Sequence, residues 1–332
     1  MKAVKITFVF LVVLVLLWIS RSEQIPFSAQ TEVSLQQGRW MINKKPTYQG
    51  TPAEGLLMNV RMVNAVFEDR KKPQIDPNEI SQRFIRAIPG YVAQGVRAFT
   101  LNLQGGVPGY EGAVNSAFAQ DGSLMKPYMQ RVQRVIEACD EQGVVVILGC
   151  FYQRQDQILS DETAVKKAVV NVARWIRKRE FKNVLLEIAN EYGIRGFDHP
   201  VLKSDAGMAS LIDLAREATP GLLVSSSGLG DGRLSPQVIA HSDFLLIHFN
   251  VTKLTDIPER LFELKKSGKA IICNEDQKLG AAAVQALRLC VENGASWGFM
   301  HLEKNQKQPF EFEGREDDAL VYDEMKKLAG SR

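Results

Sequence analysis

The chain has 332 residues, of which 45% are hydrophobic and 24% charged, and its formal net charge is +3 from 41 basic and 38 acidic residues. This composition is that of an ordinary globular protein and excludes a disordered or collagen-like chain. The length suits either two average domains or one α/β barrel. Taken alone, the basic excess would favour a nucleic acid or a membrane surface as partner.

Residues 1–22 have the pattern of a targeting segment. Two lysines precede an almost wholly apolar run over residues 6–19, and small residues precede a cleavage point after Ser22. The run is shorter than the roughly 20 residues of a bilayer-spanning helix, and it fits the core of a signal peptide. We therefore predict an exported, secreted or periplasmic protein, with residues 1–22 removed. An uncleaved signal anchor is the alternative, and only then would a membrane be a partner.

The charge excess lies in this leader. It contains Lys2, Lys5 and Arg21 and no acidic residue, so residues 23–332 keep 38 of the 41 basic residues against 38 acidic ones. A net charge of zero no longer argues for a nucleic acid, and we predict none as partner. We predict that residues 23–332 form one domain.

Four cysteines raise the question of disulfides in an exported chain. They are Cys139, Cys150, Cys273 and Cys290, and no pair has CxxC spacing. Because the last two lie in an apolar strand and a helical pattern, we expect free, buried thiols. A Cys139–Cys150 or Cys273–Cys290 bridge is the alternative.

Short apolar runs alternate with helical patterns along the chain, and such runs suit a parallel sheet buried on both faces. The predicted strands cover residues 55–61, 96–103, 144–151, 184–191, 222–227, 243–248, 270–275 and 295–301. The predicted helices begin after Asp76 and Ser123 and then cover residues 161–177, 205–217, 236–240, 258–265, 281–292 and 317–328.

Eight strands, each followed by a helix, predict a single (β/α)8 TIM barrel. A doubly wound open sheet is the alternative, but it usually has a glycine-rich turn after its first strand, and residues 61–64 have none. Residues 39–42 and 46–48 flank Asn43-Lys44-Lys45 and predict an N-terminal β-hairpin that plugs the bottom of the barrel.

Two glutamates end predicted strands, at the face of a barrel where catalytic residues lie. Glu191 ends the fourth strand and Glu275 the seventh. These strands face each other across an eight-stranded barrel. Carboxylates beside so much apolar sequence are expected either to pair with a cation or to take part in catalysis. A pair of carboxyl groups that flanks one bond is what glycoside hydrolysis needs.

The segment Leu186-Glu187-Ile188-Ala189-Asn190-Glu191, with Glu275 on strand 7, resembles the retaining glycoside hydrolase clan whose catalytic glutamates lie on strands 4 and 7. Residues 35–330 resemble family 5, the cellulase-like members. The resemblance implies Glu191 as acid/base and Glu275 as nucleophile, Asn190 at the sugar 2-hydroxyl, and His248 lining the site.

Three positions depart from the family pattern. Tyr192 stands where a proline often follows Asn-Glu, and Asp276 directly follows the nucleophile. The strand-6 His-x-Tyr reads His248-Phe249-Asn250, so a hydroxyl that commonly touches the nucleophile is missing. Asn250-Val251-Thr252 is also a glycosylation sequon, which chance alone can supply.

Further polar residues near strand ends are candidate substrate contacts. By position alone they are Arg61, Asn102, Gln104 and Tyr152, and Trp297 is either a sugar platform or core packing. Glu187 shares the inward parity of Glu191, so it needs a cation, for which Arg61 or Arg97 is the candidate. Arg61 could instead contact the nucleophile and keep it ionised.

The sequence thus predicts an exported retaining glycoside hydrolase that acts on an oligo- or polysaccharide and needs no cofactor and no metal. One alternative is a carbohydrate-binding barrel without catalysis, to which the missing tyrosine points. The other is a metal-dependent hydrolase on the same barrel. The four scattered histidines argue against the latter because His199 and His301 have no metal partner at ligand spacing.

Overall fold

The structure is a computed structural model that describes residues 27–106 and 112–330. Within those ranges no helix has the length and apolar character needed to cross a membrane. The predicted signal peptide lies outside the described residues, and its cleavage and the limits of the domain stay predictions.

Eight parallel strands form a ring. Six of them make one sheet in the order β11-β4-β5-β6-β7-β8, and β9 and β10 pair with each other. Bridges Ser227–Leu246, Ile272–Ser296 and Asp276–Phe299 join the two sheets on both sides. The predicted barrel is therefore confirmed, and the open-sheet alternative is wrong because this ring has no free edge. The strands are β4 (Asn59–Arg61), β5 (Ala98–Asn102), β6 (Val145–Phe151), β7 (Val184–Ala189), β8 (Val224–Ser225), β9 (Leu245–His248), β10 (Ile271–Glu275) and β11 (Gly298–Phe299).

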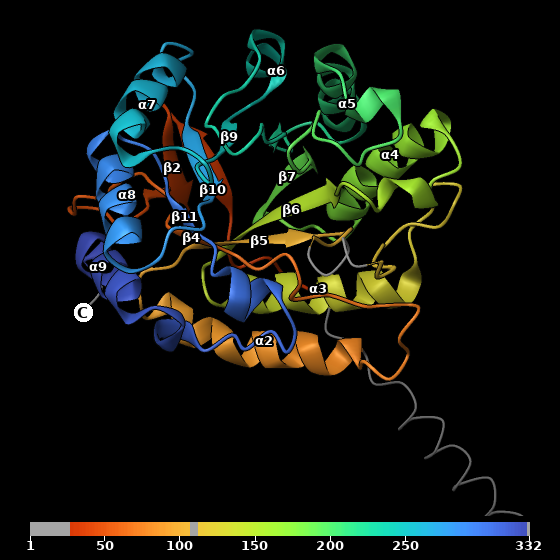
Figure 1. The fold of residues 1–332 in the computed structure, drawn as a ribbon, viewed down its shortest axis with the longest axis horizontal. Coiled ribbons are helices and arrows are strands. Elements are labelled where there is room, and N and C mark those ends of the chain that lie inside the picture. Colours follow the sequence, from red (N-terminus) through yellow and green to blue (C-terminus); the bar gives the residue numbers. More distant parts are fainter. Residues whose placement is uncertain (1–26, 107–111, 331–332) are drawn as a thin grey trace, which may run out of the picture.

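Helices surround the strands, with α2 and α3 on one side and α7, α8 and α9 on another (Figure 1). They are α2 (Pro77–Val92), α3 (Lys126–Glu141), α4 (Glu162–Lys178), α5 (Asp205–Ala218), α6 (Pro236–His241), α7 (Ile257–Lys265), α8 (Gly280–Glu292) and α9 (Ala319–Ala329). Asp76 and Asp161 cap α2 and α4 by accepting main-chain hydrogen bonds. Ser123 caps no helix; it bonds Asp121 in a turn, and α3 begins two residues later than that cap would place it.

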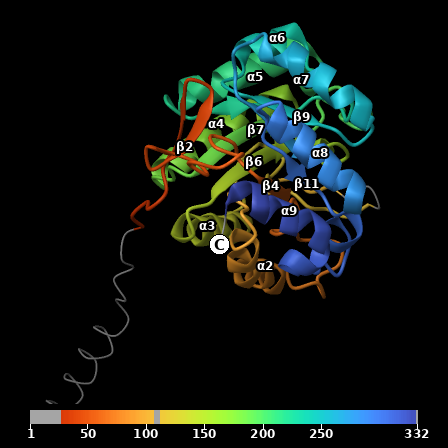
Figure 2. The same cartoon turned by 90° about the vertical axis from the view of Figure 1, so that its left-hand side faces the viewer.

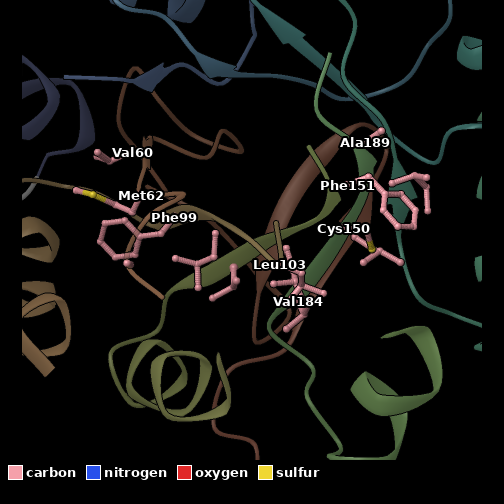
Figure 3. Packing of buried hydrophobic residues seen from close by; sticks show 14 of the residues in the cluster. Val60, Met62, Phe99, Leu103, Cys150, Phe151, Val184 and Ala189 are labelled. Carbon is pink, nitrogen blue, oxygen red and sulfur yellow. The ribbon is translucent and has the colours of Figure 1, made fainter. Parts of the chain in front are cut away.

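The barrel wall separates two apolar cores. Residues that face the helices form the larger core, part of which appears in Figure 3, with Val60, Phe99 and Phe151 among its members. The inner core contains Trp40 with Leu57, Ala98, Val145, Ile147, Leu185, Phe244, Leu246, Ala270 and Ile272. Alternate residues of a regular strand point to opposite faces. The inner-core residues therefore identify which other side chains of the same strands point into the barrel.

A three-stranded antiparallel sheet places Trp40 in that inner core. It consists of β1 (Val33–Gln36), β2 (Arg39–Ile42) and β3 (Lys45–Pro46), and β2 lies at one side of the molecule in Figure 2. Trp40 is 1% exposed and packs edge-on against Phe244. The predicted hairpin is confirmed, with β1 as an additional strand.

All four cysteines are buried and unpaired. Burial raises the pKa of each thiol, so the thiolate that reacts is disfavoured. The alternative bridges Cys139–Cys150 and Cys273–Cys290 are absent.

Candidate active site

Glu191 and Glu275 meet at the carboxyl end of the barrel. Glu275 is the last residue of β10, and Glu191 follows β7 by two residues with a positive φ of 48°. Non-glycine residues rarely adopt this backbone conformation, and it is common at active sites. A carboxylate oxygen of each glutamate and a ring nitrogen of His248 lie within 4.8 Å of one another. The spacing brings the two carboxyl groups around one small space.

Arg61 makes the shortest ion pair with the predicted nucleophile. Its Nε lies 2.7 Å from Oε2 of Glu275, and both side chains are almost fully buried. Burial alone would raise the pKa of Glu275, but Arg61 first, then His248 and the Asn250 amide, hold it below its ordinary value. Glu275 is therefore kept ionised, which a nucleophile requires.

His248 lies between the two glutamates. Its Nδ1 is 3.1 Å from Oε1 of Glu191 and 3.5 Å from Oε2 of Glu275. Burial would lower the pKa of the imidazole, but the charges of Glu275 and Glu191 outweigh burial and raise it. One ring nitrogen can thus stabilise negative charge on either glutamate.

Asn250 was not among the predicted site residues, although it occupies the position of the missing tyrosine. Its Nδ2 donates a hydrogen bond to Oε1 of Glu275 over 2.5 Å. The amide therefore supplies the donor that the absent hydroxyl would have given. The His-x-Tyr comparison marked this position, but the sequence alone could not show that an asparagine reaches the carboxylate.

Asn190 is tied to the same arginine. Its Oδ1 accepts a hydrogen bond from Nη2 of Arg61 over 2.6 Å, and its Nδ2 faces Oε1 of Gln153 at 3.4 Å. The main-chain N–H of Glu191 donates to the Ser227 hydroxyl over 2.9 Å. Gln153 and Ser227 are thus two more residues that orient the site, and only their strand-end position hinted at them.

Three other predicted contacts have different surroundings. Tyr152 follows β6 and hydrogen-bonds with Arg61. Gln104 bonds the main chain of Tyr152 and Gln155, so it braces two loops and leaves no amide atom free for a sugar. Asn102 points into the barrel, where an added Cβ at Gly149 would meet its amide at 2.6 Å. Gln104 and Asn102 are both fully buried.

Trp297 corresponds to core packing rather than to a sugar platform. It has no exposed surface, and its ring stacks on Phe299 at 5.9 Å between centroids. Its Nε1 donates to Oδ2 of Asp276 over 3.1 Å, and Lys278 binds the other oxygen at 3.0 Å. This network explains the acidic residue after the nucleophile: Asp276 is buried, paired and directed away from the glutamates' shared space.

Glu187 does not form the ion pair that its burial led us to expect. Arg61 contacts Glu275 instead, and Arg97 donates to the main-chain carbonyls of Val92 and Val96. In the described part of the chain neither carboxyl oxygen of Glu187 has a hydrogen-bond partner. Burial raises the pKa of Glu187, although the positive charges of Arg61 and His248 and the nearby Ser227 hydroxyl, which is not placed for a well-formed hydrogen bond, oppose the rise.

The trio Glu191, His248 and Glu275 has the spacing of metal ligands, so we asked whether a cation fits. The Arg61 guanidinium already neutralises Glu275 at 2.7 Å, and a divalent ion beside it would be repelled. The Asn250 amide donates a hydrogen bond to the same carboxylate. Such a donor stabilises a carboxylate anion that binds no metal. These residues fit a proton-transfer site better than a metal centre.

A cavity of about 350 Å³ lies between the segment that follows Glu191 and the loop after β8. A Cβ on Gly230 would approach Oε1 of Glu191 to 3.7 Å, so the loop after β8 passes directly beside the glutamate. A larger hollow of about 590 Å³ lies between α3 and α4, away from the glutamates. The smaller cavity is lined by Tyr192, Gly193, Lys203, Asp205, Gly228, Leu229, Asp231, Arg233, Leu234 and Ser235.

Comparison with known proteins identifies the fold. No protein-family model and no curated protein matches the sequence. An endo-1,4-β-mannanase from Rhizomucor miehei matches in structure at a TM-score of 0.62 and 10% identity, over 91% of this chain and 100% of its own. An endo-1,4-β-mannanase from Eisenia fetida matches at 0.62 and 12%, over 91% and 96%.

A further structural match belongs to a subfamily of glycoside hydrolase family 5. It is a GH5-4 broad-specificity endoglucanase from an uncultured bovine rumen ciliate, with a TM-score of 0.60 and 14% identity over 87% of this chain and 99% of its own. The chain thus has the fold of these enzymes, which confirms at the level of fold the resemblance predicted from the sequence.

Proposed function

We propose that this protein is a glycoside hydrolase that cleaves an oligo- or polysaccharide with retention of anomeric configuration. The observation that carries the proposal is the approach of Glu191 and Glu275, since one oxygen of each carboxylate lies within 4.8 Å of the other. Retaining enzymes hold their two carboxyl groups about 5–5.5 Å apart, whereas inverting enzymes need about 6.5–9.5 Å to admit a water. The structural neighbours, named as mannanases and endoglucanases, support a polysaccharide substrate.

The two glutamates have different surroundings and therefore different roles. Glu275, which Arg61 and Asn250 keep ionised, attacks the anomeric carbon while the Glu191 carboxyl gives its proton to the departing oxygen. The Glu191 carboxylate then takes a proton from water, which attacks the same carbon and releases Glu275. Because Glu191 protonates the leaving group, we expect that group on the side of Gly230, which lies beside Oε1 of Glu191.

His248 serves both steps. Negative charge passes from Glu275 to Glu191 when the glycosyl-enzyme forms, and Nδ1 contacts both. A donor fixed at the place where charge develops lowers the barrier without reorganisation. The reason for a non-catalytic alternative, the missing strand-6 tyrosine, weakens because Asn250 supplies a donor to Glu275.

Export belongs to the proposal as well. Residues 1–22 have the lysines, apolar run and small residues of a signal peptide, and a large polysaccharide is met outside the cytoplasm. Comparing the mass of the mature protein with that of the full chain tests removal of these residues.

The test of the activity uses the full chain on a panel of activated aryl glycosides and soluble polysaccharides. We expect hydrolysis of at least one class and loss of turnover in Glu275→Gln. Glu303→Gln is the control because that side chain is exposed and, among the described residues, pairs only with Lys307. Equal turnover in Glu275→Gln and wild type would contradict the mechanism, and stoichiometric zinc in the active protein would favour a metal-dependent reaction.

A further inference from the structure

A polar layer lies inside the barrel directly below the catalytic residues. Leu185 and Leu246 belong to the inner core, so Glu187 and His248, two residues further along their strands, also point inward. The pairing Gly149↔Glu187↔Ser225 places a glycine and a serine beside Glu187. The layer consists of Asn59, Thr100, Glu187 and Ser225, all without exposed surface.

Every member of this layer has a side-chain atom without a hydrogen-bond partner among the described residues. These atoms are Oδ1 of Asn59, Oγ1 of Thr100, both oxygens of Glu187 and Oγ of Ser225. Buried polar groups are almost always hydrogen-bonded, and water fills this role where several such groups surround one space. The Asn102 amide, whose two polar atoms also lack partners in the described chain, lies beside Gly149 on the neighbouring strand.

His248 faces this layer from above. Its Nδ1 contacts the two glutamates, and its Nε2, on the other edge of the ring, is fully buried and has no partner within residues 27–106 and 112–330. Glu187 is the titratable group below it whose oxygens are equally unpaired. Arg61, Glu275 and the Cys150 thiol also face Glu187, while Arg61, Glu191 and Glu275 face His248.

The buried charges balance only in certain states. Arg61 and Glu275 neutralise each other at 2.7 Å, which leaves a charged His248 without a counterion when Glu191 is protonated. Isolated buried charge is costly, so an imidazolium here needs a second anion. An ionised Glu187 can supply that negative charge. When the imidazole is neutral, a protonated Glu187 leaves no unpaired charge in the layer.

We propose that Glu187 is a positioning residue that shares one proton with His248 through water in the polar layer, and thereby sets the charge of the imidazole that touches both catalytic glutamates. The inference rests on the proposed function for its role in catalysis. When Glu191 becomes charged, the proton moves from the Glu187 carboxyl through water to Nε2 of His248, with no proton taken from bulk solvent. It returns when Glu191 is protonated again.

The test measures the titration of His248 directly, without substrate. The full chain contains four histidines, and ¹⁵N-histidine labelling with the His248→Gln variant assigns the signal of interest. Glu187→Gln keeps the shape of the side chain but removes the carboxyl group that can ionise and exchange a proton. We expect the pKa of His248 to fall by at least one unit in this variant, a tenfold loss of proton affinity. We also expect kcat, but not KM, to decrease with a shifted pH profile.

One control and one further layer variant keep the result interpretable. Asp317→Asn removes another buried carboxylate, which binds Tyr91 and Asn305, and we expect it to leave the His248 titration unchanged. Ser225→Val fills the layer and displaces water; it is expected to lower the pKa of His248 too, and it replaces Glu187→Gln should that variant not fold.

An unchanged His248 titration in either layer variant would overturn the inference. Because this readout needs no glycoside, it is independent of the proposed function. If the wild type cleaves a glycoside and the His248 titration is unchanged in the layer variants, only the role proposed for Glu187 is contradicted. If the His248 titration shifts but the protein cleaves no glycoside, only the proposed hydrolase function is contradicted.

Discussion

Nε of Arg61 forms an ion pair with Oε2 of Glu275 at 2.7 Å, and the same guanidinium donates a hydrogen bond to Oδ1 of Asn190 through Nη2 at 2.6 Å. One planar cation on β4 therefore fixes the nucleophile on β10 and the amide that follows β7. Its five donors in a rigid fork make this double contact, which a lysine ammonium cannot reproduce.

The pH dependence of activity tests this arrangement. Arg61 lowers the pKa of Glu275, so activity should persist to low pH and disappear as pH falls through that lowered pKa. In Arg61→Met we expect the pKa of Glu275 to rise and the acid limb of the kcat/KM profile to move to higher pH. Arg61→Lys keeps the charge and should shift the limb less while still reducing kcat.

The same pair stabilises the fold above the ordinary pKa of a glutamate, and this contribution is lost as pH falls through the folded pKa. Removing one partner of a buried pair costs about 3–5 kcal/mol. Denaturant unfolding at neutral pH should therefore show a loss in Arg61→Met. An acid limb that stays in place in the folded variant would contradict the assigned role of Arg61.

Asn250→Ala tests the donor that replaces the family's tyrosine. Loss of the hydrogen bond to Glu275 should lower kcat by roughly 10- to 100-fold with little change in thermal stability. Asn293→Ala is the matched control, since within the described part of the chain its amide bonds only the Leu289 carbonyl of its own helix. Equal kcat values for the two variants would exclude a role for Asn250, as would a glycan found on Asn250 of active protein.

Trp297→Phe separates core packing from sugar binding. The change leaves Oδ2 of the buried Asp276 without its indole donor, and we expect the free energy of unfolding to decrease by about 1–3 kcal/mol. KM for a polysaccharide should stay the same because the ring has no exposed face. A large rise in KM with unchanged stability would restore the platform interpretation.

Trp40→Ala tests the plug at the bottom of the barrel. The side chain is buried against Phe244 and the inner core, so its removal should cost about 3–5 kcal/mol. Trp175→Ala, on the partly exposed face of α4, should cost less. Activity per folded molecule is expected to be unchanged in both; denaturation curves that coincide for the two variants would show that the hairpin does not support the barrel.

The sequence predicted the fold well because the barrel repeats a strong local pattern. Apolar strands and amphipathic helices alternate eight times, and caps such as Asp161 mark helix starts. Boundaries were less accurate: the run over residues 222–227 forms strand only at Val224–Ser225. Apolar composition predicts burial there, whereas ladder hydrogen bonds depend on the neighbouring strands.

The catalytic glutamates were predictable because strand ends of a barrel converge. The residues that contact these glutamates were less predictable, because the direction of a side chain within a loop depends on tertiary contacts. Gln104 and Trp297 are at strand ends in the sequence, but they bond the loops and core around them. Asn250 was noted only as a departure from the pattern, and its contact with Glu275 depends on how β9 and β10 pair.

The central claim is that Glu275 forms a covalent glycosyl-enzyme with Glu191 as acid/base. Proton NMR of the first-formed product, recorded during hydrolysis of whichever glycoside the panel shows to be cleaved, tests it most directly. We predict that the product first carries the same anomeric configuration as the substrate and then mutarotates. A first-formed product of the opposite configuration would contradict the account.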